Sequence, residues 1–143
     1  MKILMVLYFI NYNLKNNDTL LLPLRSGKVI ENKLDNSYVT HPIGIFISPT
    51  NEFVVRSCSE GTVKKISKLR DGNLITVSSL RGLYYCYSPL ANIKVRKGEK
   101  VHKGTLLGNI LRVKDSENNL SFSVLRNDEF LDAKKYLVYS KHR

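Results

Sequence analysis

Three features of this 143-residue sequence predict an all-β fold. Short runs rich in β-branched and aromatic residues recur at intervals of about 8–12 residues, as strands do in sandwiches and barrels. Pairs rich in Gly, Asp and Asn separate these runs and favour turns. No stretch shows the apolar period of about 3.6 residues that marks a long amphipathic helix. These signals are typical of an antiparallel sandwich or barrel.

The composition supports a folded domain with a real core. Hydrophobic residues make up 43% of the chain, which is close to the globular average and argues against disorder. Because there are only 8 Gly, 4 Pro and 2 Cys, collagen-like chains and disulfide scaffolds are excluded. The 8 Tyr and 5 Phe favour strands over helices.

The first half of the chain contains the signals for three strands. A Ser26-Gly27 turn signal precedes a short strand over Lys28–Ile30. The apolar run Ile45–Ile47 follows Gly44, and a turn-forming SPTN segment leads into a strand over Phe53–Cys58.

A meander is predicted next. The strands Thr62–Ile66 and Leu74–Val77 flank Asp71-Gly72, a pair that accepts the positive φ values of a tight hairpin. Arg81-Gly82 then turns the chain into Leu83–Tyr87. These three strands are expected to lie side by side.

The last third carries a glycine motif and a closing strand. Lys97-Gly98 and Lys103-Gly104 form two corners six residues apart, where Gly permits a left-handed backbone. Leu120–Leu125 alternates between apolar and polar residues as far as Val124, which predicts a half-buried strand. Asn127–Phe130 is expected to be a turn, and Asp132–Leu137 a helical turn with Asp132 as its cap.

The chain is divided into a lead-in over residues 1–19, one domain over residues 20–138 and a basic tail over residues 139–143. The apolar run Ile3–Ile10 is too short for a transmembrane helix, which needs about 20 residues, so no transmembrane span is predicted. It could form the core of a signal peptide, but Asn11–Asn17 offers no small-residue cleavage site. A first strand or a packed lead-in is the alternative, so the compartment stays open.

The net charge of +11 creates a positive field that attracts nucleic acid, anionic lipid or acidic wall polymers, although a solvated surface is the plainer interpretation. Cys58 and Cys86 lack the CxxC spacing of a metal or redox motif, and each lies in a strand-like run. Buried free thiols are expected, and whether the two pair stays open.

The ordered segments resemble the lysostaphin/LytM-type zinc peptidoglycan endopeptidases, from about Leu22 to Leu137. The strongest match is Val95–Gly108, which follows the pattern V-x-x-G-x-x-V-x-x-G-x-x-(I/L)-G, although lipoyl and biotinyl domains share this glycine turn. The other matching segments are Leu22–Gly27, Pro42–Ile47, Val54–Val63, Gly72–Val77, Tyr87–Leu90, Leu120–Val124 and Asp132–Leu137. The resemblance implies an antiparallel β-sandwich with a groove across one sheet.

The resemblance also implies where a zinc site would lie. The family's three ligand positions fall on Pro42, Phe46 and Ser121, and its two further catalytic histidines fall on Pro89 and Asn119. Proline and phenylalanine offer no side-chain lone pair to a metal, and a single serine is too weak to hold zinc. We therefore expect no metal and no cofactor. The resemblance implies that the groove that remains includes these residues: Pro42, Phe46, Tyr85, Tyr87, Pro89, Asn119 and Ser121.

A shift of register does not restore the zinc site. If His41 were the first ligand, the residue four positions later would be Ile45. The other two histidines are His102, between the glycine corners, and His142, in the tail. No GxSxG, P-loop or dinucleotide motif is present, although counting residues does not exclude a Ser/His/Asp triad. Cys86 lacks a basic neighbour in sequence, and Lys65 and Lys114 lack the surroundings of a lipoyl-type carrier lysine.

The leading functional hypothesis is a catalytically inactive LytM-like domain that binds or scaffolds a protein partner or peptidoglycan in a cell-envelope or secreted assembly. The first alternative is a structural component of a larger particle or machine, such as a phage virion or a transport complex. The second alternative is a nucleic-acid-binding domain, motivated by the charge of +11.

Overall fold

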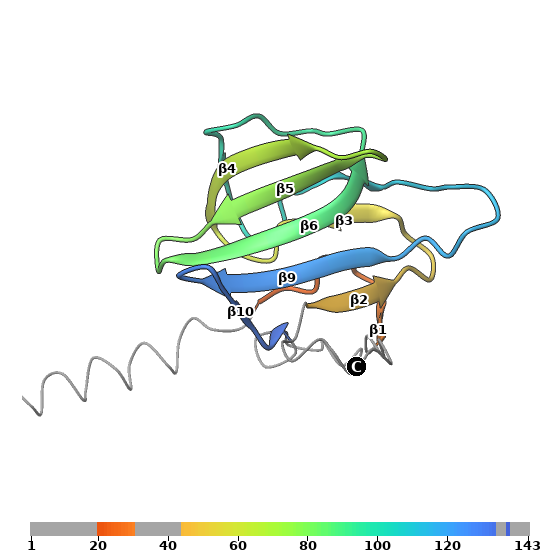
Figure 1. Ribbon diagram of the computed structural model, residues 1–143, viewed down its shortest axis with the longest axis horizontal. Coiled ribbons are helices and arrows are strands. Elements are labelled where there is room, and N and C mark those ends of the chain that lie inside the picture. Colours follow the sequence, from red (N-terminus) through yellow and green to blue (C-terminus); the bar gives the residue numbers. More distant parts are fainter. Residues whose placement is uncertain (1–19, 31–43, 134–136, 138–143) are drawn as a thin grey trace, which may run out of the picture.

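The computed structural model describes residues 20–30, 44–133 and 137, which form ten strands (Figure 1). Some of the segments discussed above lie outside the described residues, and these are Ile3–Ile10, His41, Pro42 and the basic tail. The strands are β1 (Lys28–Ile30), β2 (Ile45–Ser48), β3 (Val54–Arg56), β4 (Gly61–Lys68), β5 (Asn73–Ser78), β6 (Leu83–Ala91), β7 (Lys100–Val101), β8 (Leu106–Ile110), β9 (Leu120–Arg126) and β10 (Glu129–Leu131).

The main layer is an antiparallel sheet in the order β1-β2-β9-β6-β5-β4-β7. Figure 1 shows this layer running from β4 at the top to β2 and β1 at the bottom. The hairpin β4–β5 and the hairpin β5–β6 are the predicted meander. β9, which is distant in sequence, inserts between β6 and β2 and joins the two halves of the sheet. The predicted all-β, antiparallel fold is confirmed.

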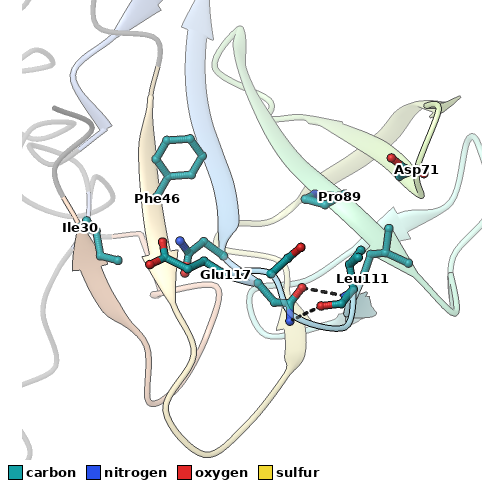
Figure 2. Close-up of a pocket in the computed structure, with 10 residues that line it drawn as sticks. Ile30, Phe46, Asp71, Pro89, Leu111 and Glu117 are labelled. Atoms are coloured by element: carbon teal, nitrogen blue, oxygen red, sulfur yellow. Dashed lines mark hydrogen bonds between the residues drawn. The ribbon is translucent and has the colours of Figure 1, made fainter. Parts of the chain in front are cut away.

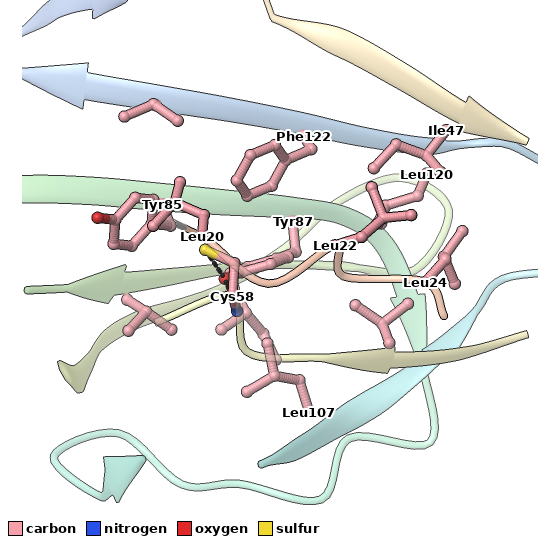
Figure 3. Close-up of a cluster of buried hydrophobic side chains, with 14 of the residues drawn as sticks. Leu20, Leu22, Leu24, Ile47, Cys58, Tyr85, Tyr87, Leu107, Leu120 and Phe122 are labelled. Carbon is pink, nitrogen blue, oxygen red and sulfur yellow. Dashed lines mark hydrogen bonds between the residues drawn. The ribbon is translucent and has the colours of Figure 1, made fainter. Parts of the chain in front are cut away.

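A smaller second layer covers the inner face of the main sheet. β3 pairs with β8, and β8 also pairs with the end of β6 at Leu90 and Ala91, so hydrogen bonding runs continuously between the layers. Leu20, Leu22 and Leu24 pass between the layers and are buried with the inward residues of β6 and β9 (Figure 3).

The sequence predicts some elements imperfectly. Leu22–Leu24 resembles an opening strand but has no ladder in the structure, because Pro23 lacks an N–H to donate. β6 continues past Tyr87 to Ala91, and β10 occupies part of the segment expected to be a turn. In Asp132–Leu137, the Leu137 N–H donates to the Ala133 carbonyl (3.3 Å), as in one helical turn, and residues 134–136 lie outside the described part.

A buried pair of polar groups lies in the centre of the core. The Tyr87 hydroxyl donates a hydrogen bond to Cys58 Sγ (3.0 Å) and accepts one from the Cys58 backbone N–H (3.0 Å), as Figure 3 shows. Both cysteines are free. Burial raises the pKa of the Cys58 thiol from its ordinary 9.0 to about 12, and burial also raises the pKa of Tyr87.

The Cys58 pKa predicts an alkaline loss of stability. Below about pH 9 the thiol is protonated in both the folded and the unfolded chain. Between pH 9 and 12 the unfolded thiol ionises while the folded one does not, so the unfolded chain is favoured. At about pH 10 the Cys58 contribution is a loss of about 1.4 kcal/mol relative to about pH 8. Urea unfolding at both pH values measures this difference in the free energy of unfolding.

The matched variant is Cys58→Ser, whose hydroxyl does not titrate in this range. Tyr87 remains in the variant, but Cys58 contributes to raising its pKa, so the difference between the two proteins reports the Cys58–Tyr87 pair. If the wild type and the variant lose equal stability between the two pH values, the assignment to Cys58 is wrong.

No helix within residues 20–30, 44–133 and 137 is long and apolar enough to cross a membrane.

Candidate functional site

The outer face of the main sheet presents the positions that the family uses for zinc. Ile45 and Ile47 of β2 are buried, so the alternation of the strand places Phe46 on the outer face. Phe46 pairs directly with Ser121 of β9. Side chains of directly opposed residues share a face, with Cβ atoms about 4.5–5.5 Å apart. The structure therefore brings the second and third ligand positions side by side.

A cleft lies at the end of this row, with a volume of about 540 Å³ (Figure 2). Three of the predicted groove residues line it: Phe46, Pro89 and Asn119. Ser121 is paired with Phe46 but does not line the cleft. The cleft is lined further by Ile30, Asp71, Leu111, Val113, Ser116, Glu117 and Asn118.

Most of the additional lining comes from the segment between β8 and β9. This segment is held by its own hydrogen bonds, because the Val113 N–H donates to Asn118 Oδ1 (2.8 Å) and Asn118 Nδ2 donates to the Val113 carbonyl (3.3 Å). A second hollow of about 310 Å³ shares Ile30 and residues 117–119 with the cleft. The sequence predicts that this segment is a polar loop. It directly precedes the segment that matches the family's HxH strand, and this position could have assigned the loop to the site.

The cleft is mildly acidic in an otherwise basic protein. Asp71 reaches it from the β4–β5 turn and Glu117 from the loop, while Phe46, Pro89 and Leu111 supply apolar surface. Ser116, Asn118 and Asn119 add a hydroxyl and two amides. A cleft of this kind offers hydrogen bonds and apolar contacts to a polar chain such as a peptide.

The expectation that Tyr85 and Tyr87 line the groove is wrong. Tyr85 is 3% exposed and Tyr87 is fully buried, because they alternate inward with Leu83 while Tyr84, Cys86 and Ser88 occupy the outer positions of β6. Every residue of Leu83–Tyr87 is apolar, aromatic or a thiol, so the sequence does not reveal which set faces the core.

Hydroxyl and thiol groups continue the outer face across the sheet. Ser121 pairs with Ser88, Ser123 with Cys86, and Cys86 with Thr76. The Thr76 hydroxyl and the Cys86 thiol lie 3.7 Å apart. The two residues that pair with Cys86, Thr76 and Ser123, are neutral hydroxyls, so neither supplies an acid or a base to the thiol.

The residues present do not fit a zinc ion. At the positions described, the family's donors are replaced by a phenyl ring, which has no lone pair, and a neutral hydroxyl. Pro42, at the remaining ligand position, has no side-chain donor, and its placement lies outside the described residues. Across residues 20–30, 44–133 and 137, no three His, Cys, Asp or Glu side chains gather closely enough to hold a metal ion. His102 is exposed, between the glycine corners.

Similar folds occur among solved structures. A chain of the SpoIIQ–SpoIIIAH pore-forming complex matches with a TM-score of 0.66 and 20% identity, over 83% of this chain and 90% of that one. The catalytic domain of the prophage-encoded M23 protein EnpA from Enterococcus faecalis, in a mutant form, gives 0.64 and 14%, over 78% and 92%. A zinc-containing peptidase from Vibrio cholerae gives 0.63 and 20%, over 82% of this chain and 38% of that one.

A comparison with curated protein sequences finds no match. The family model of peptidase family M23, in contrast, matches residues 40–133, well over half of the chain. This range contains the paired strands β2 and β9 and the lining of the cleft except Ile30. The chain therefore belongs to peptidase family M23.

Proposed function

We propose that this chain is a non-hydrolytic member of peptidase family M23 that works as a binding or scaffolding module in a cell-envelope assembly. One observation carries the proposal: Phe46 and Ser121 are paired in register on the outer face, at the two described ligand positions, and neither supplies a metal donor of useful strength. Metallopeptidase chemistry needs three protein ligands and an open position for an activated water.

The frame around these positions remains intact. Gly44 has φ of +113°, and a Cβ on it would lie 2.5 Å from the Phe122 carbonyl oxygen of β9. Such a close approach requires glycine, because a side chain would push β2 away from β9. Preservation of the frame beside a changed donor set supports a function that needs the shape of the domain and not its hydrolytic chemistry.

The cleft beside Phe46 is the surface that we assign to the partner. The half-buried Phe46 ring, Pro89 and Leu111 would cover apolar parts of a bound chain. Asn118 and Asn119 would form hydrogen bonds with the amides of that chain. A protein segment or the peptide part of peptidoglycan has this mixture of groups. That a chain with a similar fold belongs to the SpoIIQ–SpoIIIAH complex supports a role in protein assembly.

The test combines metal analysis, hydrolysis and binding. The purified protein is expected to contain no stoichiometric zinc and to release no peptide fragments from peptidoglycan after zinc is added. It is also expected to be retained by its partner, either intact peptidoglycan or an envelope protein captured by crosslinking. Tightly bound zinc at about one ion per chain, or cleavage of peptidoglycan, would end the proposal.

Two phenylalanine variants locate the binding surface. Phe46→Ala should weaken retention about tenfold or more, because an aromatic side chain at the centre of an interface commonly contributes over 1.4 kcal/mol. Phe130→Ala is the matched control, because Phe130 is 42% exposed on β10 and does not line the cleft. Equal retention of both variants would remove the cleft from the proposal.

A further inference from the structure

A second feature, independent of the cleft, is a concentration of positive charge at one edge of the main sheet. Residues 61–103 contain ten Lys or Arg and only two Asp or Glu, so most of the net charge of +11 comes from this part of the chain. Five exposed lysines lie on β4 and on the segment beside it, and we call them the basic edge: Lys64, Lys65, Lys68, Lys97 and Lys100.

Backbone pairing brings the two parts of the basic edge together. Lys100 of β7 pairs with Thr62 of β4. Next to this pair, the Val63 N–H donates to the Glu99 carbonyl (2.8 Å) and the Gly98 N–H donates to the Val63 carbonyl (2.8 Å). The segment therefore runs antiparallel to β4, with Lys100 opposite Thr62, and with Gly98 and Glu99, which follow Lys97, hydrogen-bonded to Val63, which precedes Lys64. In Figure 1 this is the upper edge, where the teal segment passes β4.

The lysines of this segment are carried on a fixed backbone. Val95 and Val101, on either side of it, are 6% and 1% exposed and belong to the core. The corner between them is closed by a hydrogen bond from the Glu99 N–H to the Arg96 carbonyl (3.1 Å). A charge row on an ordered backbone loses less conformational entropy on binding than one on a flexible loop.

The negative charge nearby is small. The Glu99 carboxylate accepts a hydrogen bond from the Arg96 backbone N–H (3.4 Å), which turns it back onto its own corner. None of the five lysines forms an ion pair with another residue in the described part of the chain. Their charges are available to an external anion.

Protection of a sheet edge explains only part of this pattern. Lysines on an edge strand discourage unwanted pairing with other chains, and this accounts for Lys64, Lys65 and Lys68. Lys100 lies on β7, which is the edge strand of the main sheet, so the same protection accounts for it. Lys97 lies outside any strand, in the corner before β7, and edge protection does not account for it.

The shape of the basic edge selects among anions. From Lys100, which is opposite Thr62, to Lys68 the row extends over six residue steps of β4, or about 20 Å, and this elongated shape suits a linear polymer better than a membrane surface. Residues 61–72 and 92–104 contain no Phe, Tyr or Trp on which nucleic-acid bases could stack. Lysine ammonium groups act as point charges for phosphate and do not require planar, bidentate recognition.

We propose that the basic edge binds a linear phosphodiester polymer without bases, of the alditol-phosphate type. The polymer would lie along β4, with its phosphates against the lysine ammonium groups. β5, β6 and β9 separate β4 from Phe46 on β2, and the two surfaces approach each other only at the β4–β5 turn, where Asp71 lines the cleft. The inference does not depend on the proposed function of the cleft.

The test measures binding of the full chain to a defined poly(glycerol phosphate) oligomer at several salt concentrations. The triple variant Lys64→Gln, Lys97→Gln, Lys100→Gln should lower the slope of log affinity against log salt by about 2, at roughly 0.7 per lost phosphate contact. The loss of affinity at 0.1 M salt should be about 100-fold. The control is Arg25→Gln, Lys28→Gln, Lys114→Gln, which removes equal charge from exposed positions outside the basic edge.

Two further arms distinguish the sources of phosphate. Single-stranded DNA of equal charge and vesicles containing an anionic phospholipid should both bind more weakly than the oligomer. Equal or tighter binding to either one overturns the assignment to a base-free polymer. Equal losses in the two triple variants overturn the assignment to the basic edge. Thermal unfolding of each variant checks that the fold is retained.

Discussion

A variant carrying Pro42→His, Phe46→Asp and Ser121→His together is expected to bind zinc, at about one ion per chain and with a dissociation constant below about 1 μM. The reason is geometric. Phe46 and Ser121 are directly opposed on β2 and β9, and side chains at such positions can approach one ion. Gly44 allows the chain at the start of β2 to approach β9 closely. Metal analysis of purified protein, followed by competition with a chelator of known affinity, measures the constant.

Partial variants serve as controls for this zinc prediction. Phe46→Asp with Ser121→His alone should bind zinc at least tenfold more weakly, because two protein ligands hold the ion less well than three. If the triple variant binds no more zinc than the wild type, the groove has lost the geometry of the family. The chain would then have diverged in shape as well as in chemistry, and the proposal that its frame is preserved would be wrong.

Among the single substitutions considered, Phe122→Ala should cause the largest loss in the free energy of unfolding, about 3–5 kcal/mol. Phe122 is fully buried in β9, its ring stacks on that of Tyr85 with centroids 6.4 Å apart, and it contacts the Tyr87 ring at 5.3 Å. Truncation removes apolar contacts and leaves a cavity in the core beneath β6 and β9. This loss is a large part of the total stability of such a domain, which is about 5–15 kcal/mol. The melting temperature is expected to fall by about 10–15 °C, since each kcal/mol lowers it by about 3 °C at this size.

Phe130→Ala is again the control, because the same chemical change on the exposed β10 should alter the unfolding free energy by less than about 0.5 kcal/mol. Chemical and thermal unfolding, monitored by circular dichroism, measure both variants. A loss below 1 kcal/mol for Phe122→Ala would contradict the description of this ring as the centre of the core.

The fold was predictable because its signals are local. Asp71-Gly72 marks the β4–β5 hairpin, where Gly72 has φ of +82°, and the alternation of Leu120–Val124 marks β9. β7 and β10 were harder to predict because they are only two and three residues long, and β7 also depends on pairing with the distant strand β4. Pro23 interrupts a strand-like run that nevertheless packs in the core.

The candidate site was predictable only in part. Phe46, Pro89 and Asn119 meet at one cleft as the resemblance implies, but Asp71 and residues 116–118 join them through contacts between segments distant in the chain. Tyr85 and Tyr87 show the limit most clearly. Alternation along a strand has a period of two, and its phase is set by the partner strands, so an apolar run such as Leu83–Tyr87 fits either phase.

The sequence by itself determined the types of side chain at the family's catalytic positions, and with them the lack of metal donors there, because the identity of a residue does not depend on how the chain folds. It also determined the positions of the turns, which depend on the local preferences of Gly, Asp and Asn. Only the tertiary structure decided which tyrosines face inward, which loop lines the cleft, and that lysines more than 30 residues apart form one edge. Those features arise from pairing between distant strands, which local sequence patterns do not specify.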